Sequence, residues 1–241
     1  MSFAIVTDSS CNLPNEIIDK YDLHIVSLVF MVEGKPYQSY VKGEENDLKR
    51  FYTMMRNKNQ ITTSCANEAA CTAVIEPLLK SGQDVLFIGF SSALSGTYQE
   101  GAKACEKLRK AYPDRKIIAV DSLCASLGEG LLVTYACQWR EKGFDIDATA
   151  EWLEDNKLKL CHWFTVDGLS PESVAEEMAK RGIALRAGLH CAPFAHKTIQ
   201  ATIPPTDSYY INTPSFNRCS RNTCIHRDCI YFSGYYSVLS F

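Results

Sequence analysis

Short apolar runs alternate with longer amphipathic segments along most of the 241-residue chain. The short runs are rich in β-branched and aromatic residues, which is typical of buried strands. They predict strands at residues 3–6, 23–32, 84–89, 116–120 and 163–166. A turn is expected at residues 33–35 and a polar loop at residues 61–67, ahead of a helix.

The amphipathic segments between these runs predict helices, because their apolar residues recur at helical spacing. The expected helices lie at residues 14–21, 46–56, 68–80, 99–111, 127–142 and 147–157. Asn12 can cap the first of them, and the mostly apolar segment 127–142 is expected to be well buried. Alternating strands and helices predict an α/β domain with a mainly parallel sheet flanked by helices. From residue 200 onward no periodicity remains, which predicts a short irregular C-terminal tail.

Small hydroxyl residues follow the ends of several predicted strands. Such clusters occur at residues 8–10, 91–92 and 121–122, and Thr63 and Ser64 could join them from ahead of their own helix. In an open α/β sheet, ligands bind beyond the carboxyl ends of the strands. The pattern therefore predicts a ligand site at this edge of the sheet, built mainly from neutral hydroxyl groups.

The segment of residues 90–98, Phe-Ser-Ser-Ala-Leu-Ser-Gly-Thr-Tyr, lies where a predicted strand gives way to a helix. The first turn of a helix has free N–H groups and the positive end of the dipole, which suit a carboxylate or a phosphate. Gly96 would allow such an anion to approach closely. The alternative is that Ser92 or Ser95 only caps the helix, and this segment alone favours capping because caps are commoner than anion sites.

Charge and motifs exclude several classes of function. The net charge of −3 includes no basic block, so nucleic acid is not an expected partner. No apolar run reaches membrane-spanning length, and the N-terminus does not resemble a signal peptide. We therefore interpret the eleven cysteines as reduced thiols of a cytoplasmic protein. The hydroxyl clusters lack histidine, and no serine-hydrolase elbow, dinucleotide fingerprint or Walker loop is present.

Five short motifs occur in an order that resembles the DegV family. They are Thr7-Asp8-Ser9-Ser10, Thr62-Thr63-Ser64, the run from Ser91 to Gln99, Val120-Asp121-Ser122 and Phe164-Thr165-Val166-Asp167. DegV proteins are bacterial fatty-acid-binding proteins that include the binding subunit of the fatty acid kinase. The resemblance covers about residues 1–168 and implies a Rossmann-like first domain there.

The resemblance also implies a ligand, a partner and a set of site residues. Thr63 and Ser95 would hold the carboxylate of a long-chain fatty acid such as palmitate or oleate, with Ser92 and Ser64 close by. The family has no catalytic residues, cofactor or metal of its own. It presents the acyl group to a separate kinase subunit, which phosphorylates the carboxylate.

The resemblance stops at Gly168, which stands where the family has an acidic residue. The family continues into a second α/β domain that closes over the acyl chain. We therefore expect a domain boundary at residue 168, an atypical segment 169–241, and a truncated protein with weakened binding. A non-functional truncated product is an alternative.

Residues 170–199 instead resemble a C-terminal piece of PLP-dependent cysteine desulfurases of the class V aminotransferase type. Cys191 matches their persulfide cysteine, but nothing upstream resembles their PLP domain or its lysine. A desulfurase fragment is thus the alternative function, although we expect neither bound PLP nor a catalytic role for Cys191. Cys219, Cys224, His226 and Cys229 match no usual zinc spacing, so no metal site is predicted.

Overall fold

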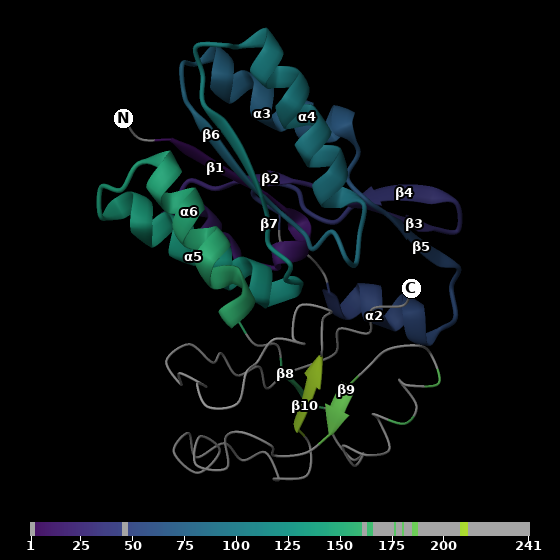
Figure 1. The fold of residues 1–241 in the computed structure, drawn as a ribbon. Coiled ribbons are helices and arrows are strands. Elements are labelled where there is room, and N and C mark those ends of the chain that lie inside the picture. Colours follow the sequence, from purple (N-terminus) through teal and green to yellow (C-terminus); the bar gives the residue numbers. More distant parts are fainter. Residues whose placement is uncertain are drawn as a thin grey trace. The chain divides into compact units, whose positions relative to one another are not determined.

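The computed structural model describes residues 3–44, 48–160, 163–165, 176, 180, 185–187 and 208–211 (Figure 1). The chain divides into two compact units, Met1–Lys157 and Leu158–Phe241, and each is described separately below.

A four-stranded parallel sheet forms the centre of the first unit. Its strands are β1 (Ala4–Asp8), β2 (His24–Val26), β6 (Val85–Gly89) and β7 (Ile117–Asp121). They lie in the order β2-β1-β6-β7, and every neighbouring pair is parallel. All five residues of β1 and of β6 are buried, which explains why residues 4–6 and the whole of β6 are apolar runs. The predicted α/β fold with a mainly parallel sheet is confirmed.

Helices cover both faces of this sheet (Figure 1). Helices α3 (Glu68–Lys80) and α4 (Thr97–Ala111) pack together on one face, and α5 (Ser126–Glu141) and α6 (Ile146–Asn156) lie on the other. Val6, Ile75 and Phe87 are fully buried in the core between the sheet and the first pair. The short helices η1 (Ser9–Cys11) and α1 (Asn15–Lys20) follow β1. Pro14, not Asn12, occupies the N-cap position of α1.

A second, antiparallel sheet in this unit was not predicted. It contains β3 (Val29–Val32), β4 (Lys35–Gln38) and β5 (Ile61–Ser64) in the order β4-β3-β5. The polar loop expected at residues 61–67 is therefore wrong over β5. Helix α2 (Leu48–Arg56) packs nearby, since the Phe51 ring contacts the Phe30 ring at a centroid distance of 5.0 Å.

The single strand predicted at residues 23–32 is in fact two strands, β2 and β3, which belong to different sheets. Between the two strands, side chains provide hydrogen-bond partners for the backbone of Leu28. The N–H of Leu28 donates to Ser9 Oγ at 2.9 Å, and Ser39 Oγ donates to the Leu28 carbonyl at 3.1 Å. These bonds replace the sheet ladder, so the chain can leave the parallel sheet at this point.

The second unit contains a three-stranded antiparallel sheet in the order β8-β10-β9. Its strands are β8 (Trp163–Thr165), β9 (Leu185–Ala187) and β10 (Ser208–Ile211). In the sequence, the short helix η2 (Lys157–Lys159) includes the division between the two units. The strand predicted at residues 163–166 is present as β8, but it does not extend the parallel sheet. Strands β9 and β10 were not predicted, because runs this short show no periodicity. The domain boundary at residue 168 stays a prediction.

Candidate functional site

Three strands of the parallel sheet end side by side at one edge. The register pairs Thr7 with Ile88 and Gly89 with Asp121, so the segments that follow β1, β6 and β7 leave the sheet at neighbouring positions. The hydroxyl residues that follow these strands therefore gather at the carboxyl edge, as the sequence predicts. This edge is where α/β sheets bind ligands.

The segment between β6 and α4 is a turn fixed by its own backbone. The N–H groups of Leu94 and Ser95 both donate to the Ser91 carbonyl at 3.0 Å. The N–H of Ser92 donates to Asp121 Oδ1 at 3.1 Å, so it is already occupied by a carboxylate of the protein. The turn presents Ser92 and Ser95 as half-buried side chains at the start of α4.

Ser95 has a local bond but is not the N-cap residue of α4. Its Oγ accepts the N–H of Thr97 at 3.2 Å and lies 3.0 Å from Thr97 Oγ1. Gly96 occupies the N-cap position and provides no side-chain cap. Within the described residues, no hydrogen bond engages the first-turn N–H groups of Tyr98 and Gln99. The turn thus combines hydroxyl groups with free N–H groups of a helix N-terminus, a combination that suits an anion.

Thr63 and Ser64 lie on β5 and are exposed. Ser64 Oγ donates to the Val29 carbonyl of the neighbouring strand at 3.3 Å, so Ser64 has a structural bond. A Cβ placed on Gly96 would lie 3.6 Å from Cys65 Sγ, just beyond β5. Side chains two residues apart on an extended chain project to the same side, so Thr63 belongs to the face that Cys65 presents. The structure therefore brings the end of β5 to the start of α4.

A buried pair of carboxyl groups, Asp8 and Glu129, lies behind this edge. Glu129 Oε1 accepts from Thr7 Oγ1 at 3.1 Å, and both side chains are fully buried. Burial is the main cause that raises the pKa of Asp8, and it raises the pKa of Glu129 well above its usual range. The sequence analysis missed Glu129, because it lies in a helix that otherwise looks apolar. An acidic residue at an apolar position was the one available signal.

The buried thiols are poor nucleophiles. Burial raises the pKa of Cys71, Cys105 and Cys137 to about 12, so each remains a neutral thiol. Cys65 is exposed. Within the described residues, no group of three or more side chains is arranged to hold a metal. Cys191 and the four residues Cys219, Cys224, His226 and Cys229 lie outside the described residues.

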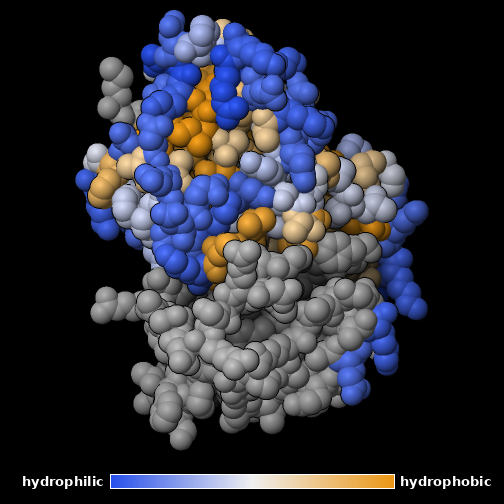
Figure 2. Space-filling model, in the orientation of Figure 1, coloured by the Kyte–Doolittle hydropathy of each residue, from blue (hydrophilic) through white to orange (hydrophobic). Residues whose placement is uncertain are grey.

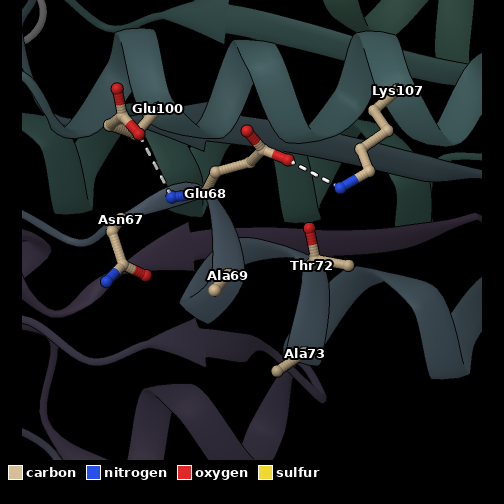
Figure 3. Close-up of a pocket in the computed structure, with 7 residues that line it drawn as sticks. All are labelled: Asn67, Glu68, Ala69, Thr72, Ala73, Glu100 and Lys107. Atoms are coloured by element: carbon tan, nitrogen blue, oxygen red, sulfur yellow. Dashed lines mark hydrogen bonds and ion pairs between the residues drawn. The ribbon is translucent and has the colours of Figure 1, made fainter.

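A surface groove of about 600 Å³ lies between α3 and α4 (Figure 3). Its only apolar lining residues are Ala69 and Ala73. An ion pair between Glu68 and Lys107 crosses it at 3.0 Å. A long acyl chain needs far more apolar surface than two alanines provide, so this groove does not fit one.

The visible surface of the first unit is mostly hydrophilic, with apolar residues in smaller patches (Figure 2). Large exposed apolar side chains in the part that the structure describes are Tyr37, Val41, Phe144 and Leu158. No described helix combines the length and the apolar character that crossing a bilayer requires.

Comparisons with known proteins agree with this architecture. The family model described as "Uncharacterised protein, DegV family" matches residues 2–171. A DegV domain-containing protein of Clostridium perfringens is 40% identical over 167 residues, which are 69% of this chain and 57% of that protein. The chain thus spans less than two thirds of the length of this relative.

Two similar solved structures are described by the lipids they bind. A DegV family protein from Thermus thermophilus, described as binding fatty acid, matches with a TM-score of 0.61 and 28% identity over 76% of this chain and 60% of its own. A DegV lipid-binding protein from Thermotoga maritima matches with a TM-score of 0.57 and 25% identity over 65% of this chain and 54% of its own. None of these similarities supports the desulfurase-like interpretation of residues 170–199.

Proposed function

The chain belongs to the DegV family, and from that membership we propose that it binds a long-chain fatty acid such as palmitate or oleate. The carboxylate would lie at the start of α4, held by the hydroxyls of Thr63 and Ser95 with Ser92 and Ser64 nearby. The observation that carries the proposal is the turn before α4, where hydroxyls and free N–H groups meet the end of β5. The relatives from Thermus thermophilus and Thermotoga maritima supply the class of ligand.

The proposed role is binding rather than catalysis. Hydroxyl and amide groups can hold a carboxylate by hydrogen bonds without reacting with it. The buried thiols are protonated, so they offer no nucleophile to the ligand. The partner that we propose is a separate fatty acid kinase subunit in the cytoplasm, which would phosphorylate the presented carboxylate.

The first test is the affinity for oleate, measured by calorimetry on the 241-residue chain. Charge-assisted hydrogen bonds contribute about 1.5–3 kcal/mol each, so Thr63→Ala and Ser95→Ala should each weaken binding about tenfold or more. Thr53→Ala is the matched control, because this exposed hydroxyl on α2 bonds only to the Lys49 carbonyl. Equal affinity of the wild type and the Thr63→Ala/Ser95→Ala double variant would remove the basis for this carboxylate site.

A second test identifies the ligand directly. Mass spectrometry of small molecules that remain bound through purification should detect a long-chain fatty acid. The Thr63→Ala/Ser95→Ala double variant should retain less of it while its circular dichroism spectrum stays unchanged. A purified wild-type protein that neither retains a fatty acid nor takes one up would contradict the proposed function.

A further inference from the structure

The two buried carboxyl groups, Asp8 and Glu129, are paired with no cation in the part of the chain that the structure describes. Asp8 ends β1, and Glu129 lies in the first turn of α5. Among the described residues, neither forms an ion pair with lysine, arginine or histidine. Two unpaired buried charges would be very costly, so at least one of the carboxyl groups is expected to be neutral.

Close packing brings these groups together from distant parts of the chain. Helix α5 approaches the segment after β1 at Gly130, where an added Cβ would lie 2.6 Å from the backbone oxygen of Cys11. Only glycine allows this approach, and Glu129 is the residue immediately before it. The helix therefore delivers the Glu129 carboxyl group to the end of β1.

The hydrogen atoms in this cluster can be counted. Ser10 Oγ lies 2.8 Å from Glu129 Oε2 and is also hydrogen-bonded to Asp8 Oδ1. A hydroxyl has one hydrogen, so it can donate to only one of two ionised carboxylates. Both contacts are hydrogen bonds when one carboxyl group is protonated. That group then donates a hydrogen bond to Ser10 Oγ, and the Ser10 hydroxyl donates a hydrogen bond to the other carboxylate.

The bonds of the Asp8 side chain identify which group is ionised. Asp8 Oδ2 accepts the N–H of Phe90 at 2.8 Å, and Oδ1 accepts the N–H of Ser10 at 3.0 Å. Both are backbone donors, which stabilise an ionised acceptor. Glu129 accepts only from the Thr7 hydroxyl besides its contact with Ser10. Glu129 is therefore the protonated member, and its proton points toward Ser10.

We propose that protonated Glu129 is a positioning residue for the candidate site. It donates a hydrogen bond to Ser10, and Ser10 donates one to Asp8. Asp8 in turn accepts the N–H of Phe90, which lies at the start of the hydroxyl-rich turn. The identity of the ligand in this inference rests on the proposed function. The hydrogen bonds that link Glu129, Ser10, Asp8 and Phe90 are independent of it. Phe90 begins the segment that contains Ser92 and Ser95, so a shift of Phe90 moves both hydroxyls.

The surroundings support this assignment. The titratable groups that face the pair from other elements are thiols, Cys11 on η1 and Cys71 on α3, and both are buried and neutral. Burial, together with the charge of Asp8, raises the pKa of Glu129 well above its usual range. Burial raises the pKa of Asp8, and the hydrogen bonds from Ser10 and from the N–H of Phe90 oppose this by lowering it, as expected when Asp8 is the ionised member.

Infrared spectroscopy tests the protonation state. The wild type at neutral pH should show the carbonyl band of a protonated carboxyl group, and Glu129→Gln should lack it. Glu151→Gln is the matched control, because this exposed glutamate lies on α6 and its replacement should leave the band in place. Absence of the band from the wild type, or its persistence in Glu129→Gln, would overturn the proposal.

The pH dependence of stability gives a second signature. Above a pH of about 4.3 the unfolded chain releases the Glu129 proton, while the folded chain keeps it until the raised pKa is reached. Rising pH therefore lowers the free energy of unfolding of the wild type. In Glu129→Gln this contribution is missing, because a glutamine side chain does not titrate. The ratio of the two unfolding equilibrium constants should change about tenfold per pH unit in this window. A constant ratio would contradict the proposal.

Amide hydrogen exchange of Phe90 tests the positioning role without any ligand. Glu129→Ala should speed this exchange about fivefold or more, the equivalent of one lost hydrogen bond, and Ser10→Ala should do the same if Glu129→Ala fails to fold. Glu129→Gln should restore protection, because its amide can donate to Ser10 and accept from Thr7. Unchanged exchange in the Ala variants would refute positioning.

Oleate titrations then connect the two proposals. If Glu129 positions the turn through Ser10 and Asp8, Glu129→Ala should lower the affinity for oleate. Glu129→Gln should restore that affinity. If the wild type binds no oleate while the Phe90 exchange pattern is as expected, the proposed function fails and the positioning role stands. If the wild type binds oleate but Phe90 exchange does not respond, the positioning role fails alone.

Discussion

Single residues set the distances between layers in this protein. Gly101 on α4 faces the ring of Phe87 on β6, and that ring is fully buried. A Cβ at this position would lie 2.2 Å from Phe87 Cε1, which is well inside van der Waals contact. The helix can therefore lie close to the sheet only while residue 101 has no side chain.

Gly101→Ala should consequently destabilise the protein. Moving the buried Phe87 ring or the helix costs about 1–3 kcal/mol, and the better helix propensity of alanine offsets up to about 1 kcal/mol of this. Urea unfolding should show a lower free energy of unfolding. Gly96→Ala is the control, because its Cβ would make an ordinary 3.6 Å contact with Cys65 Sγ. Equal stability of Gly101→Ala and the wild type would show that Phe87 has room to move.

At this scale the sequence predicts positions better than bonds. It identifies Ser92 and Ser95 as residues of a strand-to-helix turn, and they are found in one. It does not predict that Asp121 already occupies the N–H of Ser92, because that bond joins residues 29 positions apart. It also misses Glu129, whose partners Thr7 and Ser10 lie 122 and 119 positions away.

The sequence predicts strands well where both faces of the sheet are buried, and poorly where one face is exposed to solvent. Residues 4–6 of β1 and all of β6 form apolar runs, because helices cover both faces of their sheet. Strand β5 has three exposed residues in a row, Thr62, Thr63 and Ser64, so its sequence lacks the alternation that indicates a strand. Its β-branched Ile61, Thr62 and Thr63 were the remaining signal.

The start of α3 follows directly on β5, and its cap can be tested. Asn67 Oδ1 accepts the N–H of Ala70 at 2.9 Å, which satisfies one free donor of the first turn. Asn67→Ala should lower the free energy of unfolding by about 1 kcal/mol in thermal or urea denaturation. Asn57→Ala is a suitable control, since this exposed asparagine lies after the end of α2. No difference between the two variants would argue that water replaces the cap.

At the scale of the whole molecule, the family match and the central sheet occupy the same part of the chain. The family model covers residues 2–171, and the parallel sheet with its four covering helices lies within Met1–Lys157. The strand and helix alternation of this part is what made its fold predictable. The pairing of β8 was not predictable, because a three-residue strand gives no indication of its partner.

A chain that ends at Asp167 should fold by itself. The buried apolar residues of the described part lie between Phe3 and Leu160, so this truncation removes none of them. We expect a cooperative thermal transition with a Tm close to that of the 241-residue chain. Circular dichroism melting of both chains is the measurement. An unfolded spectrum for the shorter chain would mean that residues after 167 complete the core.

Strand β4 has a consequence for the behaviour of the protein at high concentration. It lies at the outer position of its sheet and all four of its residues are exposed, so its free backbone groups face solvent. Such an edge invites strand pairing with another molecule, the first step of aggregation. Lys35 adds a charge at this edge, and Pro36 has no N–H to donate. A second chain that paired with β4 would therefore meet an interrupted ladder, which disfavours the growth of fibrils from this edge.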